Sequence, residues 1–407
     1  MSEQHCNTTS NPLAWVAGSD APEKSALDLG FMALTDSASL IVAATQGFAQ
    51  PYGLTLNLKR QASWAVLRDK LLSGELDAAQ MLYGQVYGIH LGLSGAPAEM
   101  AILMALSQNG QAINLSAALR DAGVVTAEAL RARAHQSGAR KLTFAQTLPT
   151  GTHAMWLNYW LASQGVHPLE DVSTLVVPPP QMVAHLQAGR IDGFCAGGPW
   201  GAVAVEQNQG FTLATSQMIW PDHPEKVLGV TAAFAEAYPN TARALSMAVL
   251  EASRFIEASE ENKRSTAQLI SGSEYVDAPL SAIQPRFLGQ YEDGLGHAWL
   301  DAHPLRFFAN GEVNFPWLSD GIWFLTQFRR WGLLREDPDY LGLARQIHRL
   351  DIYRDACAAL DIAVPEQQMR RSTLIDGRVW DGNDPAGYAA SFDIHARATV
   401  AAAHVAR

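Results

Sequence analysis

The chain has 407 residues, of which 48% are hydrophobic and 17% are charged, and its formal net charge is −11. This composition favours a folded protein with a sizeable core over a disordered one, and the length suits two domains. The negative charge argues against direct binding to nucleic-acid phosphates. The cysteines Cys6, Cys195 and Cys357 lie far apart, so the sequence indicates neither a disulfide framework nor a clustered metal site.

The N-terminal region lacks the features of a targeting segment. Residues 1–30 contain Glu3, Asp20 and Glu23 and no apolar run of roughly 7–15 residues, as a signal peptide requires. No segment of the chain approaches the roughly 20 apolar residues of a membrane span. Provided that the printed start is the natural one, we expect a cytoplasmic protein with no signal peptide, lipid anchor or membrane contact.

The first predicted elements alternate strands with helices after a polar lead. Residues 1–26 are polar and are expected to be partly flexible. Asp36 or Ser37 is the expected N-cap of the first helix, because short oxygen-bearing side chains accept hydrogen bonds from the first turn. The predicted elements are a strand over 27–34, a helix to about residue 48, a strand over 54–58 and a helix that begins at Trp64.

One sequence phrase occurs twice. Residues 72–78 read LSGELDA, and residues 187–193 repeat the pattern as QAGRIDG. Each copy ends an amphipathic helix with Gly and enters an apolar run, and a strand precedes each (54–58, and a short buried strand over 174–177). A unit of strand, helix, Gly and strand that occurs twice predicts two similar α/β lobes, between which small ligands bind. The alternative is that these are two ordinary helix–Gly–strand junctions, which are common in α/β proteins.

The second half of the chain continues this pattern and then becomes mostly helical. After about residue 265 it is rich in Arg and Trp, and we expect it to pack on the first lobe. The predicted domains are therefore 27–135 plus 265–407 as lobe I and 136–264 as lobe II. The elements expected here are helices over 127–134 (capped by Thr126), 154–163, 181–187 and 241–258, a strand over 142–146, and an Ala-rich C-terminal helix from about 394.

Motifs of the common enzyme classes are absent from the sequence. There is no Gly-x-Ser-x-Gly elbow, P-loop, His-Glu-x-x-His or Gly-x-Gly-x-x-Gly at a strand–helix junction. The twelve histidines show no metal-ligand spacing, and His90, His185 and His297 are interpreted as surface or core residues. We therefore predict no catalytic residue, no metal, no cofactor and no enzymatic activity.

Four places in the sequence suit an anion. Residues 151–153, Gly-Thr-His, enter a helix, where free N–H groups and the helix dipole favour negative charge. Lys226 ends a stiff loop that contains two prolines, and Gln111 ends a polar loop at the carboxyl end of the apolar run 100–106. Trp64 begins a helix and carries an indole N–H. Each has a plain alternative: a helix cap, a surface lysine, an ordinary turn and a core tryptophan.

These places belong to longer stretches that, from about residue 27 to 360, resemble the nitrate- and bicarbonate-binding proteins of ABC importers, the NrtA/CmpA family. The resemblance implies an α/β fold of the two-lobed, periplasmic-binding-protein-like type II, with a ligand cleft between the lobes. The stretches that carry it are 63–69, 109–111, 151–153, 177–183, 192–195, 222–226 and 323–332.

The resemblance also implies a ligand set. Nitrate would contact Trp64 and Gln111 from one lobe and His153 and Lys226 from the other, and Gly151 would offer backbone at the same corner. Lys226 would supply the only full charge in the site, and the other side chains would donate hydrogen bonds that the anion's charge strengthens. Because the contacts come from both lobes, nitrate would favour the closed form.

Two departures from the family refine this hypothesis. The family's usual Gly-Glu-Pro-Trp reads Gly-Gly-Pro-Trp over residues 197–200, which weakens a calcium-assisted bicarbonate function. Without an export signal, the chain instead resembles the cytoplasmic nitrate/nitrite sensors of the NasS type. That resemblance implies a protein partner, an ANTAR-type antiterminator (NasT-like), which is released when nitrate or nitrite binds and which contacts the RNA itself.

Two other functions remain open at this point. The chain is alternatively the substrate-binding subunit of a nitrate ABC importer whose signal peptide is missing. It is otherwise an enzyme of the same fold, such as a pyrimidine-precursor synthase or a desulfonation-type relative, although no nucleophile or cofactor motif supports that.

Overall fold

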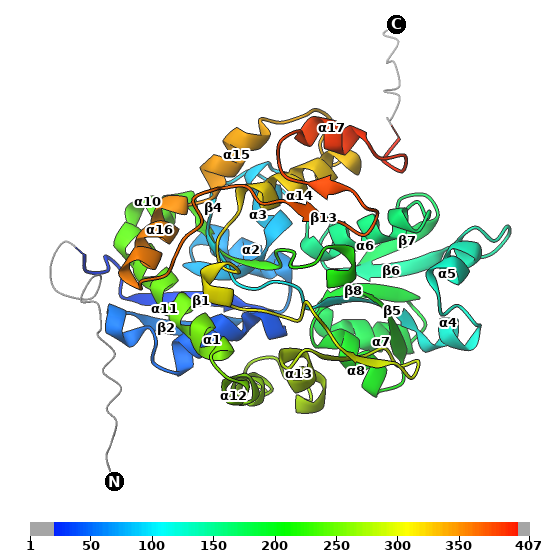
Figure 1. Ribbon diagram of the computed structural model, residues 1–407, viewed down its shortest axis with the longest axis horizontal. Helices are drawn as coiled ribbons and strands as arrows, with labels where there is room; N and C mark the ends of the chain where they lie inside the picture. Colours follow the sequence, from blue (N-terminus) through cyan, green and yellow to red (C-terminus); the bar gives the residue numbers. More distant parts are fainter. Residues whose placement is uncertain (1–19, 398–407) are drawn as a thin grey trace, which may run out of the picture.

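The computed structural model describes residues 20–397 and shows two α/β lobes side by side (Figure 1). Each lobe is built around a five-stranded sheet, with strand orders β2-β1-β3-β10-β4 and β7-β6-β8-β5-β9. The predicted two-lobed α/β architecture is therefore confirmed. The C-terminal helix predicted from about 394 lies mostly outside the described residues, and 394–397 are not helical.

Lobe I is formed by two separate parts of the chain. Strands β1 and β3 run parallel to each other, β1 is also parallel to β2, and β10 lies antiparallel between β3 and β4. The β3 and β4 strands are buried along their whole length, as apolar strands covered by helices on both faces are. The elements are β1 (Ala26–Phe31), α1 (Ala38–Thr45), β2 (Thr55–Arg60), α2 (Trp64–Ser73), β3 (Ala78–Leu82), α3 (Tyr83–His90), β4 (Met100–Ala105), β10 (Lys226–Thr231), α10 (Ala232–Ala237), α11 (Pro239–Glu257) and α12 (Glu260–Ile270).

Lobe II repeats this arrangement, with β5 antiparallel between β8 and β9. Strand β7 lies at the edge of the sheet and leaves Leu175 and Val176 exposed, so the prediction of a buried strand here was wrong. The elements are β5 (Gln111–Ser116), α4 (Ala117–Asp121), α5 (Ala127–Ala134), β6 (Leu142–Gln146), α6 (Thr152–Ser163), β7 (Val172–Val176), α7 (Met182–Gln187), β8 (Gly193–Gly197), α8 (Trp200–Glu206), β9 (Gly210–Thr215) and α9 (Ser216–Ile219).

The repeated phrase marks the same structural unit in both lobes. Helix α2 leads into β3 through Gly74, and α7 leads into β8 through Gly189. Both glycines have positive φ (80° and 64°), a conformation that glycine adopts without steric cost at a helix C-terminus. The twin-lobe prediction is thus confirmed by the equivalent positions of these two turns.

The sheets correct the predicted lobe boundaries of 27–135 plus 265–407 and 136–264. Strand β5, with α4 and α5 after it, belongs to lobe II, and β10, with α10 and α11 after it, belongs to lobe I. The chain therefore crosses between lobes at 106–110 and again at 220–225. Sequence patterns identify the strands, but which sheet accepts a strand is decided by long-range pairing that the pattern does not encode.

The C-terminal third packs mainly on lobe I, as predicted, and also reaches lobe II. Helix α14 (Leu318–Arg330) contacts α3, and α15 (Tyr340–Ile347) and α16 (Leu350–Ala359) contact β4. Helix α13 (Leu280–Phe287) instead contacts α8 of lobe II. The tail, which includes α17 (Pro385–Ala390), bonds to lobe II through Ile375 N–H to the Ile219 carbonyl (2.8 Å). Two short hairpins complete the fold: β11 (Gln290–Glu292) with β12 (Ala298–Leu300), and β13 (Ser372–Thr373) with β14 (Val379–Trp380).

The end of the predicted flexible lead is fixed on lobe I. The Glu23 carboxylate accepts hydrogen bonds from the backbone N–H groups of Asn240 (3.0 Å) and Thr241 (2.8 Å) at the start of α11. Lys24 pairs with Asp77 at 2.5 Å. Residues 20–25 are therefore ordered by long-range contacts, which corrects the prediction for that part, and residues 1–19 lie outside the described range. None of the helices within 20–397 is long and apolar enough to cross a bilayer.

Candidate anion-binding site

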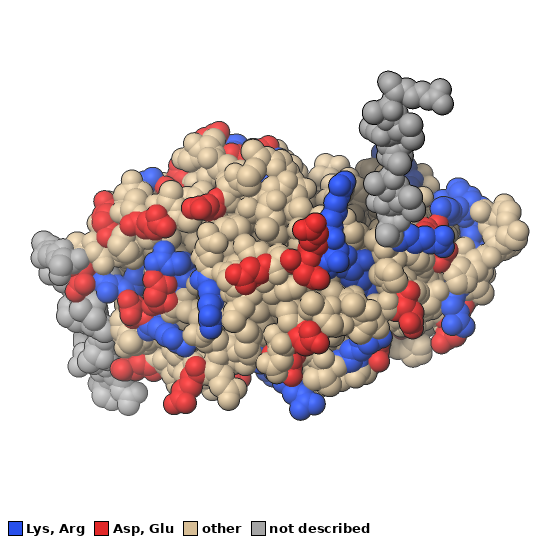
Figure 2. All heavy atoms as spheres, turned by 90° about the horizontal axis from the view of Figure 1, so that it is seen from above, with Lys and Arg blue, Asp and Glu red and all other residues tan. Residues whose placement is uncertain are grey.

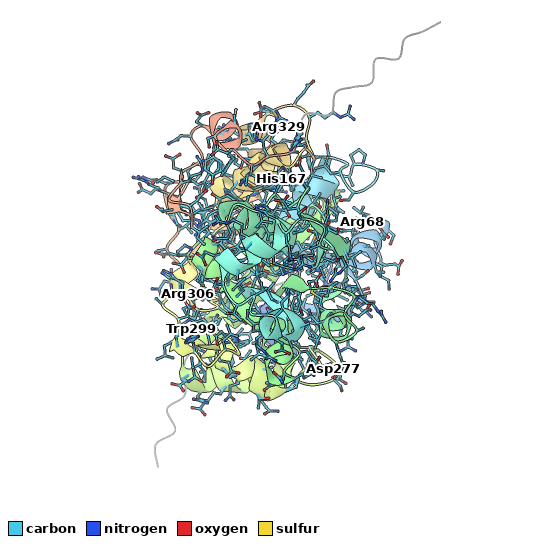
Figure 3. The ribbon with its side chains drawn as sticks, turned by 90° about the vertical axis from the view of Figure 1, so that its right-hand side faces the viewer. Arg68, His167, Asp277, Trp299, Arg306 and Arg329 are labelled. Carbon is cyan, nitrogen blue, oxygen red and sulfur yellow. The ribbon has the colours of Figure 1, made fainter. Side chains whose placement is uncertain are left out.

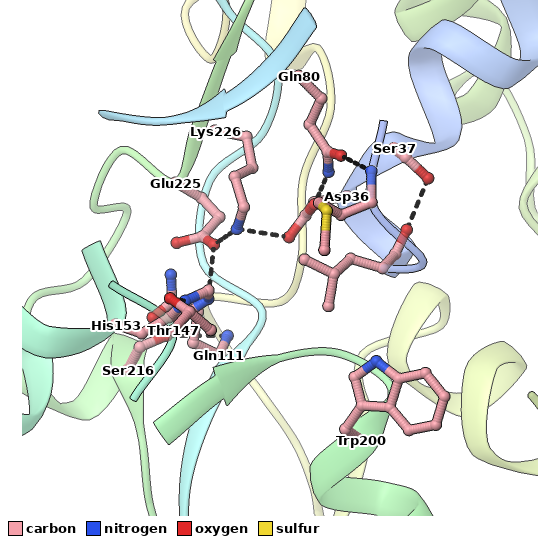
Figure 4. A network of polar contacts seen from close by, with 12 residues as sticks. Asp36, Ser37, Gln80, Gln111, Thr147, His153, Trp200, Ser216, Glu225 and Lys226 are labelled. Atoms are coloured by element: carbon pink, nitrogen blue, oxygen red, sulfur yellow. Dashed lines mark hydrogen bonds and ion pairs between the residues drawn. The ribbon is translucent and has the colours of Figure 1, made fainter. Parts of the chain in front are cut away.

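Lys226 is the first residue of β10, at the second crossing between the lobes, and its side chain is fully buried. Its ammonium Nζ lies 2.9 Å from Asp36 Oδ2 and also contacts Glu225 Oε1 (Figure 4). The surface-lysine alternative is thereby excluded. The expectation that Lys226 is the only full charge in the site was wrong, because two buried carboxyl groups stand beside it.

Asp36 has a different role from the helix cap that the sequence suggested. It lies in a 3-10 turn, η1 (Thr35–Ser37), and α1 begins at Ala38 without a side-chain cap. Its Oδ1 accepts a hydrogen bond from Gln80 Nε2, while Gln80 Oε1 accepts one from the Met32 N–H at 2.8 Å. Asp36 is therefore held by β3 and oriented towards Lys226.

Lobe II contributes two side chains that can donate hydrogen bonds to a ligand. His153 lies in the first turn of α6, where its Nδ1 is 2.6 Å from Thr147 Oγ1. Its Nε2 has no hydrogen-bond partner within residues 20–397 and lies 3.7 Å from Glu225 Oε1. Gln111 begins β5, and its Nε2 likewise has no partner, although its backbone N–H donates to Ser216 Oγ (3.1 Å). Both side chains are buried.

Trp64 adds a third unused donor from lobe I. It is the first residue of α2, capped by Ser63, whose Oγ accepts from the Val66 N–H at 3.2 Å. The indole is 1% exposed and its Nε1 has no partner among the described residues. Lys226 Nζ lies 5.7 Å from the centre of the ring. The core and ligand interpretations of Trp64 are thus compatible, since a buried ring carries a free donor.

The lobe that carries each residue differs from the expectation. Trp64 and Lys226 belong to lobe I, and Gln111 and His153 belong to lobe II. Gly197 marks where they meet, because it pairs with Gln111 across the sheet. A Cβ atom at Gly197 would lie 3.0 Å from Asp36 Oδ2 and 3.6 Å from His153 Nε2.

Gly151 lies where the two lobes approach each other closely. It is the N-cap of α6, and its N–H donates to the Leu148 carbonyl (2.9 Å), so this N–H is not free for a ligand here. A Cβ at Gly151 would lie 2.7 Å from Leu82 Cδ1 of lobe I. A Cβ at Gly88 of α3 would lie 2.7 Å from Thr150 Oγ1 of lobe II. Glycine at these positions permits the lobes to approach closely. The structure therefore shows the lobes in a closed arrangement.

The electrostatics of the site follow from its burial. Burial, followed by the charge of Lys226, lowers the pKa of His153 well below its usual 6.5, so the imidazole is neutral. Burial alone would lower the pKa of Lys226, but Asp36 and Glu225 outweigh it and raise that pKa, so the ammonium persists. Burial raises the pKa of Asp36, and it raises the pKa of Glu225 to about 8 although Lys226 opposes it.

The arrangement suits a small anion with several acceptor oxygens. Buried N–H groups are normally hydrogen-bonded, and here three unpartnered nitrogen atoms gather beside a buried ammonium group, an arrangement that could receive the oxygens of an anion. Residues 20–397 contain no group of three or more His, Cys, Asp or Glu side chains that fits a metal ion. Elsewhere, His297 pairs with Asp293 (2.6 Å), and His90 Nδ1 accepts from the Met100 N–H (3.3 Å).

Sequence reasoning missed several residues of the site. Glu225 lies next to Lys226 within the stretch 222–226 and could have been found from the sequence, because a carboxyl group beside a lysine proposed for a buried site needs an explanation. Asp36, Gln80, Thr147 and Gly197 gave no such signal, since each fits an ordinary cap, strand or turn.

Two lobes joined by two crossings, with donors from both lobes around one buried point, define the class of two-lobed solute-binding proteins. A solved structure with this fold is the periplasmic nitrate-binding protein NrtA from Synechocystis PCC 6803. It is 35% identical, with a TM-score of 0.87, over 92% of this chain and 100% of that one. The alkanesulfonate-binding protein SsuA from Xanthomonas axonopodis pv. citri shares the fold at a TM-score of 0.57 and 13% identity, over 80% of this chain and 99% of that one.

The particular family follows from the sequence comparison. The NMT1-like family model matches residues 20–271, and the chain belongs to this family. Its curated relatives include the nitrate/nitrite binding protein NrtA from Synechocystis sp. PCC 6803, 37% identical over 93% of this chain and 87% of that protein. The nitrate import ATP-binding protein NrtC from the same organism is 37% identical over 93% of this chain, which spans only 57% of NrtC. The predicted kinship with the NrtA/CmpA family is thus confirmed.

Proposed function

We propose that this protein binds nitrate or nitrite between its two lobes. The observation that carries the proposal is the set of three buried, unpartnered nitrogen atoms around Lys226: Trp64 Nε1, Gln111 Nε2 and His153 Nε2. The first two are N–H donors, and His153 Nε2 donates in the tautomer in which Nδ1 accepts from the Thr147 hydroxyl. Nitrate is a planar monoanion with three acceptor oxygens, and burying it without such donors would be prohibitively costly. The relatives named as nitrate/nitrite binding proteins support the same ligand.

We further propose that the protein is a cytoplasmic sensor of the NasS type. In this role it holds an ANTAR-type antiterminator (NasT-like) inactive and releases it when the anion closes the lobes, so that nitrate-assimilation genes are transcribed. The sequence resemblance supports the role, and the net charge of −11 favours a protein partner over RNA. Acidic and basic side chains are interspersed over the face in Figure 2, so the negative charge is not gathered there.

The Arg-rich helical part of the C-terminal third is one candidate surface for this partner. Arg329, labelled at the rim of the molecule in Figure 3, lies in the last turn of α14 and pairs with Asp337 at 3.1 Å. Arg349 pairs with Asp351 at 2.6 Å. These local pairs neutralise part of the charge, which favours a solvated face over a partner surface at these two positions.

A second function has its own support. The relatives named NrtA, and the solved structure titled a periplasmic nitrate-binding protein, favour the substrate-binding subunit of a nitrate importer. That function uses the same ligand and the same closed lobes, but its partner is a membrane permease.

Isothermal titration of the purified protein with nitrate, nitrite and bicarbonate tests the ligand. We expect micromolar binding of nitrate or nitrite and no heat with bicarbonate, because the residue before Pro199 is glycine and a carboxylate is missing there. No heat with nitrate or nitrite would refute the anion site.

Co-purification tests the two roles. A co-expressed ANTAR-type antiterminator should remain on the tagged protein without nitrate and elute when nitrate is added. Stimulation by nitrate-loaded protein of the ATPase of a nitrate permease complex in vesicles, with no retention of the antiterminator, would establish the importer role instead.

A further inference from the structure

Of the two carboxyl groups in the site, Glu225 has fewer hydrogen-bond donors to stabilise a negative charge. It lies directly before β10 and is fully buried. Its Oε1 contacts Lys226 Nζ and lies 3.7 Å from His153 Nε2, but its Oε2 has no hydrogen-bond partner among the described residues. A buried carboxylate oxygen without a donor is costly, whereas a protonated oxygen needs only an acceptor.

Asp36 differs from Glu225 in this respect. Its Oδ1 accepts from Gln80 Nε2 and its Oδ2 from Lys226 Nζ at 2.9 Å, so both oxygens have donors. Figure 4 shows Asp36 between Gln80 and Lys226, with Glu225 on the other side of the lysine. Asp36 is therefore the counter-ion of Lys226, and Glu225 is a second, surplus carboxyl group.

The charge balance decides how an anion can enter. With Asp36 and Glu225 both ionised, the buried triad with Lys226 carries one net negative charge, and nitrate would raise it to two. With a proton on Glu225 the triad is neutral, and nitrate brings the only net charge. Like charges buried close together are strongly unfavourable, so the anion and the ionised Glu225 exclude each other.

We propose that Glu225 is a further ligand-binding residue that binds nitrate as a neutral carboxylic acid, so that an anion enters together with one proton wherever Glu225 is ionised in the free protein. This inference rests on the proposed function. The proton comes from solvent and binds Glu225 Oε2, whose O–H then donates to a nitrate oxygen. No other bond is formed or broken, and Oε1 remains available to accept from Lys226.

Titratable and charged side chains from several elements surround Glu225. Lys226 faces it from β10, Asp36 from η1, His153 from α6 and Cys195 from β8, and His223 lies in the crossing segment. Burial raises the pKa of Glu225 to about 8, and the Trp156 indole lowers it slightly without reaching hydrogen-bond geometry.

The other titratable groups near Glu225 are poorer candidates for taking up the proton between about pH 6.5 and 9. Burial lowers the pKa of His223 to about 3 and that of His153 well below 6.5, and it raises the pKa of the Cys195 thiol. Burial also raises the pKa of Asp36, so the experiment has to distinguish the two carboxyl groups.

The test is calorimetry of the full chain with sodium nitrate, from about pH 6.5 to about pH 9, in phosphate and in Tris, whose ionisation enthalpies differ. We expect uptake approaching one proton per nitrate at pH 9 and little uptake near pH 6.5. Above about pH 8 the Kd should rise about tenfold per pH unit. Glu225→Gln should bind without proton uptake and with a Kd independent of pH, while Glu206→Gln, an exposed position on α8, should behave as the wild type.

The opposing outcomes are distinct. Nitrate binding whose heat is independent of buffer, and whose Kd is independent of pH, would overturn the inference and leave the proposed function intact. No heat in any buffer would refute the proposed function itself. Proton uptake that survives in Glu225→Gln and disappears in Asp36→Asn or His153→Gln would overturn the assignment to Glu225.

A second measurement tests the inference without the Glu225→Gln variant, in case that variant does not fold. At about pH 9, where Glu225 is ionised in the free protein, infrared difference spectra of the wild type should gain a protonated-carboxyl C=O band when nitrate is added. The same band should appear in Asp36→Asn. Its absence from the wild type, or its loss in Asp36→Asn, would overturn the inference.

Discussion

Lys226 and Asp36 are separated by 190 positions in the chain, yet Lys226 Nζ and Asp36 Oδ2 lie 2.9 Å apart in the closed centre of the molecule. Asp36 comes from the first turn after β1, and Lys226 begins the strand that returns to the same sheet after lobe II. The pair therefore forms only when the second crossing has brought β10 back into lobe I. The assembly of lobe I and the proposed recognition of the anion therefore both involve this ion pair.

Replacing the lysine tests both roles. Lys226→Met should abolish nitrate binding, because it removes the cation of the site. It should also destabilise the fold by about 3–5 kcal/mol near pH 8, since two buried carboxyl groups lose their partner. Urea unfolding at several pH values measures this, and the loss should shrink at low pH, where the carboxyl groups take up protons.

Two variants serve as references for Lys226→Met. Lys226→Met with Asp36→Asn should recover part of the lost stability, and Lys70→Met, at a partly exposed lysine, should change it by less than about 1 kcal/mol. Full stability of Lys226→Met near pH 8 would contradict the buried ion pair, and unchanged nitrate affinity would remove Lys226 from the site.

Trp64→Phe tests the unused indole donor. The change removes Nε1, which has no partner in the absence of ligand, so the unfolding free energy should change little. Nitrate affinity should fall by about 1–2 kcal/mol, the value of one charge-assisted hydrogen bond. Trp331→Phe is the matched control, because its Nε1 is also buried without a partner but belongs to a different part of the fold. Equal affinities in the two variants would leave Trp64 as a core residue only.

Gly84→Ala tests whether nitrate requires the closed lobes. A Cβ at Gly84 of α3 would overlap the Thr150 backbone oxygen of lobe II, so the lobes have to move apart. Overpacking of this kind costs about 1–3 kcal/mol, which should appear as a nitrate Kd about 5–150-fold higher.

Small-angle scattering completes that test. With saturating nitrate, Gly84→Ala should retain a larger radius of gyration than the wild type. Gly272→Ala, where the nearest atom to the added Cβ lies at an ordinary 3.4 Å, should match the wild type in both measurements. Wild-type affinity in Gly84→Ala would show that binding does not depend on this contact.

The pH dependence of stability provides a ligand-free check on Glu225. Its pKa is raised from 4.5 to about 8 in the folded protein, so the folded state holds the proton more tightly than the unfolded chain between these values. The stabilisation is complete below pH 4.5 and is lost as pH rises through about 8. His223 and His348, with pKa values lowered by burial to about 3 and about 4, act in the opposite direction, but only below about pH 6.5.

The window from about pH 6.5 to 8 therefore excludes the histidines, and comparison with Glu225→Gln separates Glu225 from Asp36, whose pKa burial also raises. We expect the Tm of the ligand-free protein to fall across this window, and the fall to be reduced in Glu225→Gln. A wild-type Tm that is constant or rises between these pH values would contradict a proton held by Glu225.

Local patterns in the sequence determined most elements of this protein. The strand over 142–146 and the helix over 127–134 with its Thr126 cap appear as predicted, because alternation, caps and breakers act within a few residues. The repeated phrase at 72–78 and 187–193 likewise specified two equivalent turns, since a glycine that ends a helix needs only its own backbone freedom. The resemblance to the family added Trp64, Gln111, His153 and Lys226, which local patterns alone left as caps, turns or core.

Only the tertiary structure decided how these parts combine. Strand β5 pairs in lobe II and β10 in lobe I because each fits between strands distant in the chain, and no local pattern specifies that partner. The same long-range pairing places Asp36 and Glu225 on either side of Lys226 and buries all three side chains. The charge state of a carboxyl group depends on that burial and on those neighbours, so the ionisation of the site is a property of the folded protein alone.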